Sequence, residues 1–311
     1  MARIVVCEFM DERAVAQMAA RHDVLYDPAL VDDAARLHAE AARCDALVVR
    51  NRTQVGGELL EALARCRVVG RLGVGLDNID TAGCAARGIR VMPATGANAQ
   101  SVAEYVIAVS LLMLRGAYGA TAAVAGGQWP RAALSNGREI SGKTLGLVGF
   151  GSIGQRTARL ARAVGMQVIA FDAMLDDDHP AFADAGARCA GLDEVITTSD
   201  VLSLHVPLVD STRGLFDAAR IAGMKRGAIL VNTARGGVVD EVALAGALRS
   251  GRLGGAALDV FAEEPLPRAA HLEGCPNLLL TPHIAGVSME SNERVSDMIA
   301  AGVLDALEAQ A

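Results

Sequence analysis

The stretch LGLVGFGSIGQRTARLARAVG, residues 145–165, decides the fold of this chain. It begins with a short apolar run that is typical of a buried strand, and it continues with a segment whose apolar residues recur at the spacing of a helix. Three glycines, Gly149, Gly151 and Gly154, lie where the two halves meet. A strand that turns into a helix through glycines at this spacing predicts the opening of a βαβ unit.

Similar apolar runs occur along the whole chain and alternate with helical stretches. Because such strands are buried on both faces, the alternation predicts parallel sheets covered by helices. The predicted fold class is therefore α/β, with two doubly wound parallel-sheet domains. The expected strands lie at 3–9, 46–50, 68–73, 144–151, 167–172, 201–207, 228–234 and 256–261, and the expected helices include 11–21, 56–65, 153–165 and 241–250.

A helical stretch at 98–126 suggests where the two domains divide, because it is too long for one crossover helix and a new βαβ series follows it. The last helical stretch, 288–310, could pack back on the first domain. We therefore expect a discontinuous, flavodoxin-like substrate domain, 1–97 plus 285–311. A Rossmann cofactor domain, 98–284, would be inserted into it.

Composition excludes several classes of function. The net charge of −7 argues against a nucleic-acid surface. The six cysteines form no CxxC pair and no metal-ligand spacing, which indicates a reducing compartment and no metal site. The N-terminus does not resemble a signal peptide, and the apolar run 106–114 is too short to span a bilayer. We therefore expect a cytoplasmic protein without a membrane partner.

The glycine-rich turn has the context that a dinucleotide site requires. Gly149 allows the tight turn, Gly151 lets the backbone approach a pyrophosphate, and Gly154 lets the helix pack on the strand. Asp172 ends the next strand, close to the spacing of about 20 residues expected for an acid that binds ribose. No arginine follows it to hold a 2′-phosphate, so the sequence favours NAD over NADP. An ordinary βαβ turn with a surface aspartate is the alternative.

A second motif, VNTARGGVVD at 231–240, carries Arg235 to the end of an apolar strand. Doubly wound sheets bind ligands at the carboxyl ends of their strands, and a guanidinium there suits bidentate binding of a carboxylate. We interpret Gly236 and Gly237 as leaving room for a substrate. A lone arginine at a strand end is more often a partner in a surface salt bridge.

Two further strand ends carry ionisable residues. The segment ALDVFAEEP contains Asp259, Glu263 and Glu264, and LLLTPHIAG contains His283. Histidine is the natural general base near neutral pH, and a neighbouring carboxylate would orient its ring. Taken singly, Glu264 could be a loop acid, and His283 could be a capping or buried neutral histidine.

Taken together, these motifs match a known family. From Gly149 to Gly286 the chain resembles the D-isomer-specific 2-hydroxyacid dehydrogenases, in their phosphoglycerate dehydrogenase-like branch. The resemblance depends on GFGSIG, LHVPL, NTARGGVVDE, AALDVFAEEP and TPHIAG, and on RLGVGLDNID and SVAE earlier in the chain. Because the motifs follow the family's order over nearly the whole chain, the match is specific.

The resemblance implies a role for each matched residue. Arg235 would orient the substrate, Glu264 would be the acid, and His283 would shuttle the proton. Asp259 would bind the nicotinamide carboxamide, and Asp172 would bind the adenosine ribose. The further implied cofactor contacts are Gly149, Gly151, Ser152, Ile153, Gly154, Val206, Thr233 and Ala234, and the backbone of Gly73, Val74 and Gly75 would bind the substrate carboxylate.

The segment VVRNRTQV bears on the choice of substrate. It resembles phosphoglycerate dehydrogenase-like enzymes at Arg50 and Thr53, and Arg52 would point the same way as Arg50 if the segment is extended. Two guanidiniums suit a substrate with a second anion, a phosphate or a sulfonate; Arg52 could equally lie on the solvated face. Together with RLGVGLDNID and PATGANAQSVAEYV, this segment resembles the (S)-sulfolactate dehydrogenase branch.

These inferences predict an NAD-dependent oxidoreductase that interconverts a small D-configured 2-hydroxy acid and its 2-oxo acid, with (S)-sulfolactate and sulfopyruvate favoured. The alternatives are 3-phosphoglycerate dehydrogenase, hydroxypyruvate or glyoxylate reductase, and a corepressor-like protein that senses NAD. Formate dehydrogenases have a glutamine in place of Glu264, which argues against them. Trp129 and Arg131 fall in a segment that forms a dimer arm in such enzymes, so we expect a homodimer.

Overall fold

The structure, a computed structural model, describes residues 1–309. The chain divides into two compact units, and each has its own parallel sheet. Unit 1 consists of Met1–Asn98 and Val287–Ala311, and unit 2 consists of Ala99–Gly286. The α/β class with two doubly wound sheets, predicted from the alternating pattern, is confirmed.

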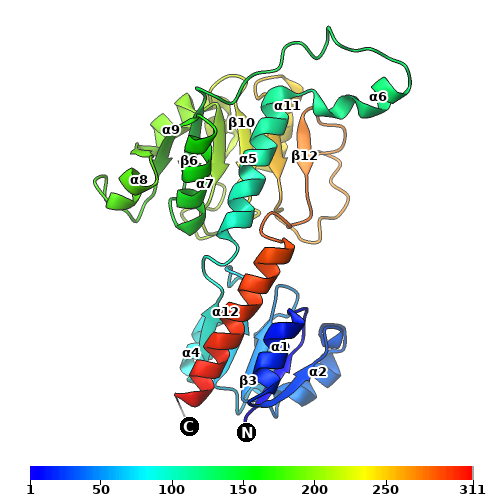
Figure 1. The fold of residues 1–311 in the computed structure, drawn as a ribbon, viewed down its shortest axis with the longest axis vertical. Coiled ribbons are helices and arrows are strands. Elements are labelled where there is room, and N and C mark those ends of the chain that lie inside the picture. The colour runs from blue at the N-terminus through cyan, green and yellow to red at the C-terminus, as the bar shows by residue number, and fades with distance from the viewer. Residues whose placement is uncertain (310–311) are drawn as a thin grey trace. The chain divides into compact units, whose positions relative to one another are not determined.

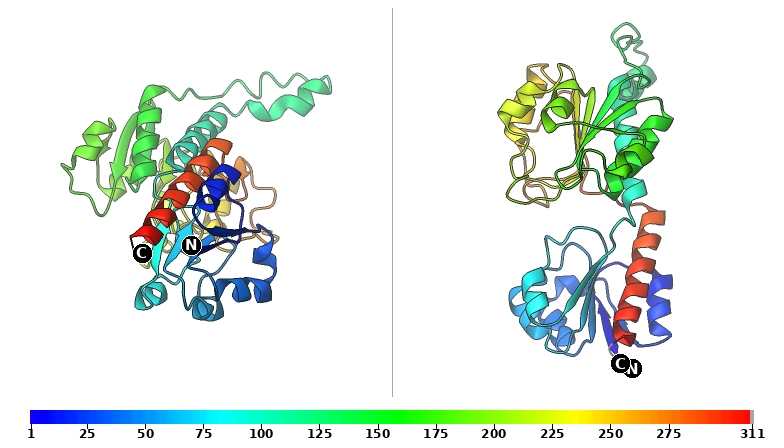
Figure 2. Two further views of the ribbon diagram at one scale, coloured as in Figure 1. Left: turned by 60° about the horizontal axis from the view of Figure 1, so that its bottom comes forward. Right: turned by 90° about the vertical axis from the view of Figure 1, so that its left-hand side faces the viewer.

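Unit 1 contains a five-stranded parallel sheet in the order β2-β1-β3-β4-β5, which is the flavodoxin-like order. Helices α1 and α12 cover one face, and α2, α3 and α4 cover the other (Figures 1 and 2). The strands are β1 (Arg3–Val6), β2 (Asp23–Tyr26), β3 (Ala46–Val49), β4 (Val68–Arg71) and β5 (Arg90–Pro93). The helices are α1 (Glu12–Ala19), η1 (Leu30–Asp32), α2 (Ala34–Ala41), α3 (Gly57–Ala62), α4 (Thr81–Ala86) and α12 (Met289–Glu308).

The last helix, α12, packs closely on the sheet of unit 1. Its apolar residues Val295, Ile299 and Val303 are buried against Val6 and the other strand residues of that face. The helix lies close because Gly70 of β4 has no side chain: a Cβ there would lie 2.7 Å from Cγ2 of Ile299. The first strands and the last helix of the chain therefore share one core.

Unit 2 contains a seven-stranded parallel sheet in the order β12-β11-β10-β9-β6-β7-β8. Helices α5, α7 and α8 cover one face, and α9, α10 and α11 cover the other (Figure 2). The strands are β6 (Thr144–Val148), β7 (Gln167–Phe171), β8 (Arg188–Cys189), β9 (Val201–Leu204), β10 (Ile229–Asn232), β11 (Gly255–Leu258) and β12 (Leu278–Leu280). The helices are α5 (Ala99–Arg115), η2 (Tyr118–Ala120), α6 (Thr121–Ala125), α7 (Ser152–Ala163), α8 (Pro180–Asp184), α9 (Leu192–Thr198), α10 (Ala218–Gly223) and α11 (Glu241–Arg249).

The order of the strands places the ligand-binding edge of unit 2. From β6 the chain proceeds to β7 and β8 on one side, and from β9 to β10, β11 and β12 on the other. The direction of winding therefore reverses between β6 and β9. In open α/β sheets ligands bind at such a switch point, outside the carboxyl ends of the strands.

The structure corrects the expected helix at 98–126. Helix α5 ends at Arg115, because the next residue, Gly116, has a φ of +65° that a helix does not continue through. The chain then forms η2 and α6 and a long loop that extends away from the sheet of unit 2 (Figure 1). Within the described residues no single helix is long and apolar enough to cross a membrane, whereas α5 and the segment Tyr118–Ala125, bent by 71°, satisfy that test as a pair by length and composition.

Candidate active site

The loop after β10 carries Arg235 at the carboxyl edge of the unit 2 sheet. Asn232, the last residue of β10, is buried and holds this loop through its side chain. Its Nδ2 donates to the carbonyl of Arg235 at 3.0 Å, and its Oδ1 accepts from the N–H of Ala234 at 3.1 Å. The guanidinium of Arg235 donates through Nη1 to the carbonyl of Ala234 at 2.6 Å. The base of the arginine is therefore fixed by an amide that the sequence analysis did not select.

The structure gives a different reason for the glycine at position 236 from the one that the sequence suggested. A Cβ on Gly236 would lie 1.6 Å from the carbonyl oxygen of Phe261, so backbone and not substrate fills the space beside it. The interpretation that this glycine leaves room for a substrate is therefore wrong. Gly237 has a φ of +77°, which favours glycine on conformational grounds. The missing side chain of Gly236 lets the loop of Arg235 pack against the loop that carries Glu264.

Glu264 and His283 are in direct contact. Nδ1 of His283 lies 2.6 Å from Oε2 of Glu264, and Oε1 of Glu264 accepts from the N–H of Phe261 at 2.9 Å. Their side chains are 42% and 32% exposed, so the pair remains accessible to a substrate. Because a carboxylate accepts the proton on Nδ1, the lone pair of His283 lies on Nε2, which is the atom that can take a proton.

The backbone of His283 is strained. Its φ is +55°, a left-handed conformation that costs a non-glycine residue of order 1–2 kcal/mol. Hydrogen bonds hold it there: its N–H donates to the carbonyl of Asp259 at 2.8 Å and to that of Thr281 at 3.0 Å. Strain that the surrounding structure maintains in this way is typical of functional sites.

Asp259 holds the loop of His283 with its side chain as well. Its carboxylate is buried, with Oδ1 accepting from Thr281 Oγ1 at 2.5 Å and from the N–H of Ile284 at 2.8 Å. Oδ2 accepts from the N–H of Ala285 at 2.8 Å. In this structure Asp259 therefore positions the loop that carries His283. Its expected bond to a nicotinamide carboxamide stays a prediction.

The three glycines of the turn after β6 have three different surroundings, and these fit a dinucleotide. A Cβ on Gly149, whose φ is +95°, would lie 2.4 Å from the carbonyl oxygen of His205, and one on Gly154 would lie 2.5 Å from the carbonyl oxygen of Gly149. Around Gly151 there is open space, and no side chain caps the first turn of α7. The free N–H groups of that turn, Ser152 and Ile153 among its residues, are suited to bind a pyrophosphate.

Asp172 follows β7 beside the same turn. Its Oδ2 accepts from the N–H of Phe150 at 2.6 Å, and its Oδ1 accepts from the N–H of Met174 at 2.9 Å. The carboxylate is therefore fixed next to the glycine-rich turn, as a residue that binds ribose must be. Among its hydrogen-bond partners there is no arginine that could hold a 2′-phosphate.

Two enclosed polar atoms at the same edge lack partners among the described residues: Nδ1 of His205, which follows β9, and Oγ1 of Thr233, which follows β10. Such orphaned atoms cost of order 1–3 kcal/mol unless a ligand or water satisfies them. His205 Nε2 lies 3.0 Å from Ser203 Oγ. If Ser203 donates that bond, Nδ1 carries the proton and can donate to an oxygen of a bound dinucleotide.

Sequence reasoning placed Val206 and Thr233 at this edge but missed His205, the residue directly before Val206. In the structure the Val206 side chain lies next to Gly149, 3.2 Å from where a Cβ would be, and Ala234 is buried. Burial lowers the pKa of His205 to about 4, so this histidine is neutral at physiological pH. The signal that could have found it is a titratable residue inside the apolar run VLSLHVP.

In unit 1 a buried acid, Glu8, organises the loop after β3. Its Oε1 accepts from the N–H groups of Arg50 and Thr53 at 2.8 and 3.1 Å, and its Oε2 accepts from that of Arg52 at 3.1 Å. Sequence reasoning missed Glu8, although an acid within the apolar run RIVVCEF was a visible signal.

The two arginines of that loop have different surroundings. Arg52 forms an ion pair with Asp32 at the surface, where the two side chains are 57% and 61% exposed. Arg50 is half-buried: its Nη2 donates to Asn292 Oδ1 at 2.8 Å, and its guanidinium lies 5.7 Å from the ring centroid of Phe9. Burial lowers the pKa of Arg50 from its ordinary value. The surface pairing of Arg52 weakens the expectation that both arginines bind one anion.

The backbone of 73–75 follows β4, as expected. The N–H of Gly73 donates to the carbonyl of Arg71 at 2.8 Å, and its carbonyl accepts from the N–H of Ala94. Hence Gly73 cannot offer its N–H to a carboxylate without opening this turn. The N–H groups of Val74 and Gly75 form no hydrogen bond within the described residues.

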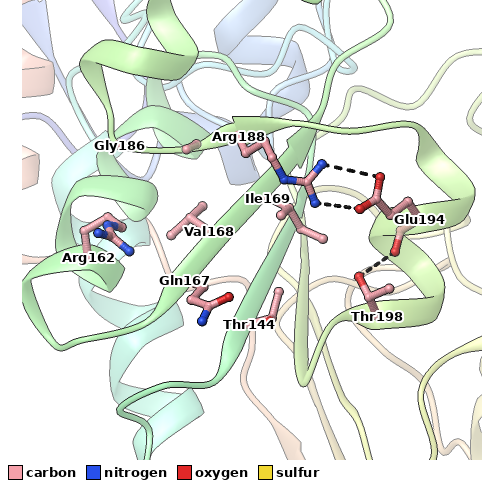
Figure 3. Close-up of a pocket in the computed structure, with 10 residues that line it drawn as sticks. Thr144, Arg162, Gln167, Val168, Ile169, Gly186, Arg188, Glu194 and Thr198 are labelled. Carbon is pink, nitrogen blue, oxygen red and sulfur yellow. Dashed lines mark hydrogen bonds and ion pairs between the residues drawn. The ribbon is translucent and has the colours of Figure 1, made fainter.

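A cavity of about 500 Å³ lies elsewhere in unit 2 (Figure 3). Thr144, Gln167 and Arg188, the first residues of β6, β7 and β8, line it, so it opens at the amino ends of these strands. Arg188 there is paired with Glu194 at 2.5 Å. This cavity lies at the edge of the sheet opposite to the glycine-rich turn, and Arg235, Glu264 and His283 do not line it. Nowhere in residues 1–309 do three or more His, Cys, Asp or Glu side chains gather as a metal site.

Comparison with known proteins identifies relatives of this chain in sequence and in structure. A family model described as the NAD-binding domain of D-isomer specific 2-hydroxyacid dehydrogenases matches residues 107–285. The chain is 51% identical over 296 residues to an (S)-sulfolactate dehydrogenase of Chromohalobacter salexigens, with 95% of each chain covered. It is 42% identical over 253 residues to a hydroxypyruvate reductase of Thermotoga maritima, with 81% of each covered. A glyoxylate reductase structure from Paecilomyes thermophila matches with a TM-score of 0.86 at 29% identity, covering 99% of this chain and 96% of that one.

Proposed function

Because this chain belongs to the D-isomer-specific 2-hydroxyacid dehydrogenases, we propose that it interconverts (S)-sulfolactate and sulfopyruvate. The chain is an NAD-dependent oxidoreductase of 2-hydroxy acids, as its family is. The chemical part of the proposal is carried by one observation, the contact between His283 Nδ1 and Glu264 Oε2 at the same sheet edge as Arg235. The choice of substrate is supported by the 51% identity to an (S)-sulfolactate dehydrogenase.

His283 and Glu264 supply the acid–base chemistry. In oxidation, Nε2 of His283 takes the proton of the substrate hydroxyl, and in reduction it returns that proton. Glu264 fixes the ring in the tautomer that leaves Nε2 unprotonated, and it stabilises the imidazolium that forms. A bound NAD would supply the acceptor for the hydride that leaves the second carbon of the substrate.

Arg235 supplies orientation and electrostatic stabilisation. Its planar guanidinium binds the substrate carboxylate and polarises the oxygen of the 2-oxo group, on which charge develops during reduction. The short loop that joins it to β10 is held by Asn232 and by the packing of Gly236 on Phe261. The arginine is therefore preorganised and does not have to be ordered during the reaction.

The proposed cofactor site lies at the carboxyl edge of the sheet, between β6 and β9. The N–H groups at the start of α7 would hold the pyrophosphate, with Gly151 leaving the approach open. Asp172 would bind the adenosine ribose, and the enclosed atoms of His205 and Thr233 would find partners in the bound dinucleotide. The remaining contacts that we propose are Gly149, Ser152, Ile153, Gly154, Val206, Ala234 and, for the carboxamide, Asp259.

On the substrate side we propose that the N–H groups of Val74 and Gly75 bind the carboxylate. Arg50 is the better candidate for the second anion, because its guanidinium has an amide and an aromatic ring as neighbours, whereas Arg52 is neutralised by Asp32. A desolvated guanidinium binds a sulfonate or phosphate more strongly than an exposed one does.

We also propose that the enzyme is a cytoplasmic homodimer. Apolar side chains remain exposed on the outer face of α5 and along the segment after it: Leu111 is 40% exposed, Tyr118 62% and Trp129 78%. Exposed apolar residues gathered on one segment mark an interaction surface. A second copy of this chain, offering the same surface, is the proposed partner.

The proposal is tested by NADH oxidation with purified protein and a panel of 2-oxo acids: sulfopyruvate, 3-phosphohydroxypyruvate, hydroxypyruvate, glyoxylate and pyruvate. We expect the highest kcat/KM for sulfopyruvate. A preference for hydroxypyruvate or for the phosphorylated acid would overturn the choice of substrate but leave the dehydrogenase assignment in place. NADH binding without turnover of any 2-oxo acid would contradict the proposed catalytic roles.

A further inference from the structure

A second carboxylate binds the loop that carries Glu264. Glu241, the first residue of α11, directs its side chain to the loop that follows β11. Its Oε1 accepts from the N–H of Ala262 at 3.1 Å, and its Oε2 lies 3.3 Å from Nε2 of His271. The side chain of Glu241 is only 13% exposed. None of these groups has a part in the mechanism described above.

The Phe261–Ala262 segment is thus held by two carboxylates at once. The N–H of Phe261 donates to Glu264, and the next N–H along the chain, that of Ala262, donates to Glu241. Each carboxylate also contacts one histidine, His283 in one case and His271 in the other. Two successive peptide groups of this loop are therefore each bound by a carboxylate that also contacts a histidine.

The same peptide segment contacts the loop of Arg235. The carbonyl oxygen of Phe261 occupies the space that a Cβ on Gly236 would fill. Movement of this segment would therefore disturb both the arginine loop and Glu264. Residues 262–265 are exposed, so their position depends on hydrogen bonds more than on apolar packing.

We propose that Glu241, held by His271, is a positioning residue: it fixes the Phe261–Ala262 peptide and thereby keeps Glu264 against His283. This proposal depends on the catalytic roles proposed above for Glu264 and His283, but not on the choice of substrate. Positioning errors of about 1 Å cost as much as 100-fold in rate, so the loss of one such hydrogen bond is measurable.

The experiment compares Glu241→Ala, Glu241→Gln and the control Glu263→Ala, which removes an exposed acid from the same loop. Each is assayed with whichever 2-oxo acid the wild type reduces fastest, and NADH affinity is measured by fluorescence titration. We expect Glu241→Ala to lower kcat about 10- to 100-fold while the Kd for NADH changes less than about twofold. The Gln variant, which keeps an acceptor for the N–H of Ala262, recovers most of kcat, and Glu263→Ala equals the wild type.

The alternative is that Glu241 only stabilises the start of α11 through its negative charge. In that case Gln and Ala would lower the melting temperature alike and kcat would follow stability, which would overturn the proposal. A double variant provides a second test, because a residue that acts through Glu264 loses its effect once Glu264 is changed. We expect Glu241→Ala to cost less than about threefold in a Glu264→Gln background; independent, multiplying losses would also overturn it. If instead Glu264→Gln itself kept wild-type kcat, the proposed function would fail, whatever Glu241 does.

Discussion

His283 Nδ1 contacts Glu264 Oε2 at 2.6 Å while the backbone of His283 is held at a φ of +55°. The contact and the strain have a common cause. Asp259 receives the N–H groups of three successive residues, that of His283 on its carbonyl and those of Ile284 and Ala285 on its carboxylate, and this turns the imidazole toward Glu264. A buried aspartate thus maintains the geometry that the proposed acid–base chemistry needs.

Replacement of His283 by alanine removes the proposed general base. Acid–base groups of this kind contribute about 10²- to 10⁴-fold, so we expect kcat to fall within that range. The Kd for NADH, measured by fluorescence titration, is expected to stay within about threefold of the wild type, since the proposed cofactor contacts are elsewhere. Loss of NADH binding in this variant would contradict the division of roles.

Two glycines of the same turn are expected to respond differently to one methyl group. Gly151→Ala places a Cβ in open space, so it should weaken NADH binding without lowering the melting temperature. Gly154→Ala places a Cβ 2.5 Å from the carbonyl oxygen of Gly149, so it should lower both. Thermal unfolding and NADH titration of the two variants test this, and equal losses of stability would refute the assignment of the open space to the cofactor.

The pH dependence of stability should report on His205. Burial lowers the pKa of His205 to about 4, whereas a histidine in the unfolded chain titrates near 6.5. Between these values the unfolded state binds a proton that the folded state does not. This residue therefore leaves stability unchanged above about pH 6.5, and stability is lost as the pH falls from there toward 4.

The expected loss from His205 at pH 5, relative to pH 7.5, is about 2 kcal/mol in the free energy of unfolding. Urea unfolding followed by circular dichroism measures it, with His205→Asn as the control that lacks the titrating ring. The wild type should lose about 2 kcal/mol more than the variant over this interval. The same pH dependence in both proteins would mean that His205 is not buried as a neutral group.

Arg50 and Arg52 can be separated by their substrates. We expect Arg50→Gln to lower kcat/KM for sulfopyruvate about 10- to 100-fold, because a charge-assisted hydrogen bond is worth about 1.5–3 kcal/mol. Glyoxylate has no second anion, so its kcat/KM should change far less. Arg52→Gln, which breaks a surface ion pair with Asp32, is expected to stay near wild type with both acids. Equal selective losses in the two variants would show that both arginines bind the second anion.

The proposed homodimer is tested by a charge on α5. Leu111→Glu places a carboxylate on the exposed apolar face of that helix, and we expect a monomer by light scattering, because an unpaired charge cannot be buried at an interface. Met298→Glu, on a similarly exposed position of α12, is the matched control and should remain dimeric. A wild-type protein that is monomeric at micromolar concentration would rule out the proposal.

Short-range features of the sequence were sufficient to predict much of the fold. The glycines of the turn after β6 and the apolar strands are defined by their immediate neighbours, so their patterns could be interpreted locally. The edge strands β2, β5 and β8 were missed because they are short and partly exposed, which removes the continuous apolar run. The helix expected at 98–126 was predicted too long because the hydrophobic pattern contains no information on the positive φ of Gly116, which follows the last residue of the helix.

The sequence by itself determined the α/β class, the dinucleotide-binding turn and the presence of Arg235, Glu264 and His283 at strand ends. Only the tertiary structure decided how they are held: Gly236 is required by a carbonyl from another loop, Asp32 neutralises Arg52, and Glu8, His205 and Glu241 hold or line the sites. The physical reason is the distance in the sequence over which each interaction acts. Hydrophobic periodicity and turn geometry depend on adjacent residues, so they can be recognised locally. A buried hydrogen bond or a close backbone contact joins segments that are far apart in the sequence, and nothing in the local pattern of either segment shows that they touch.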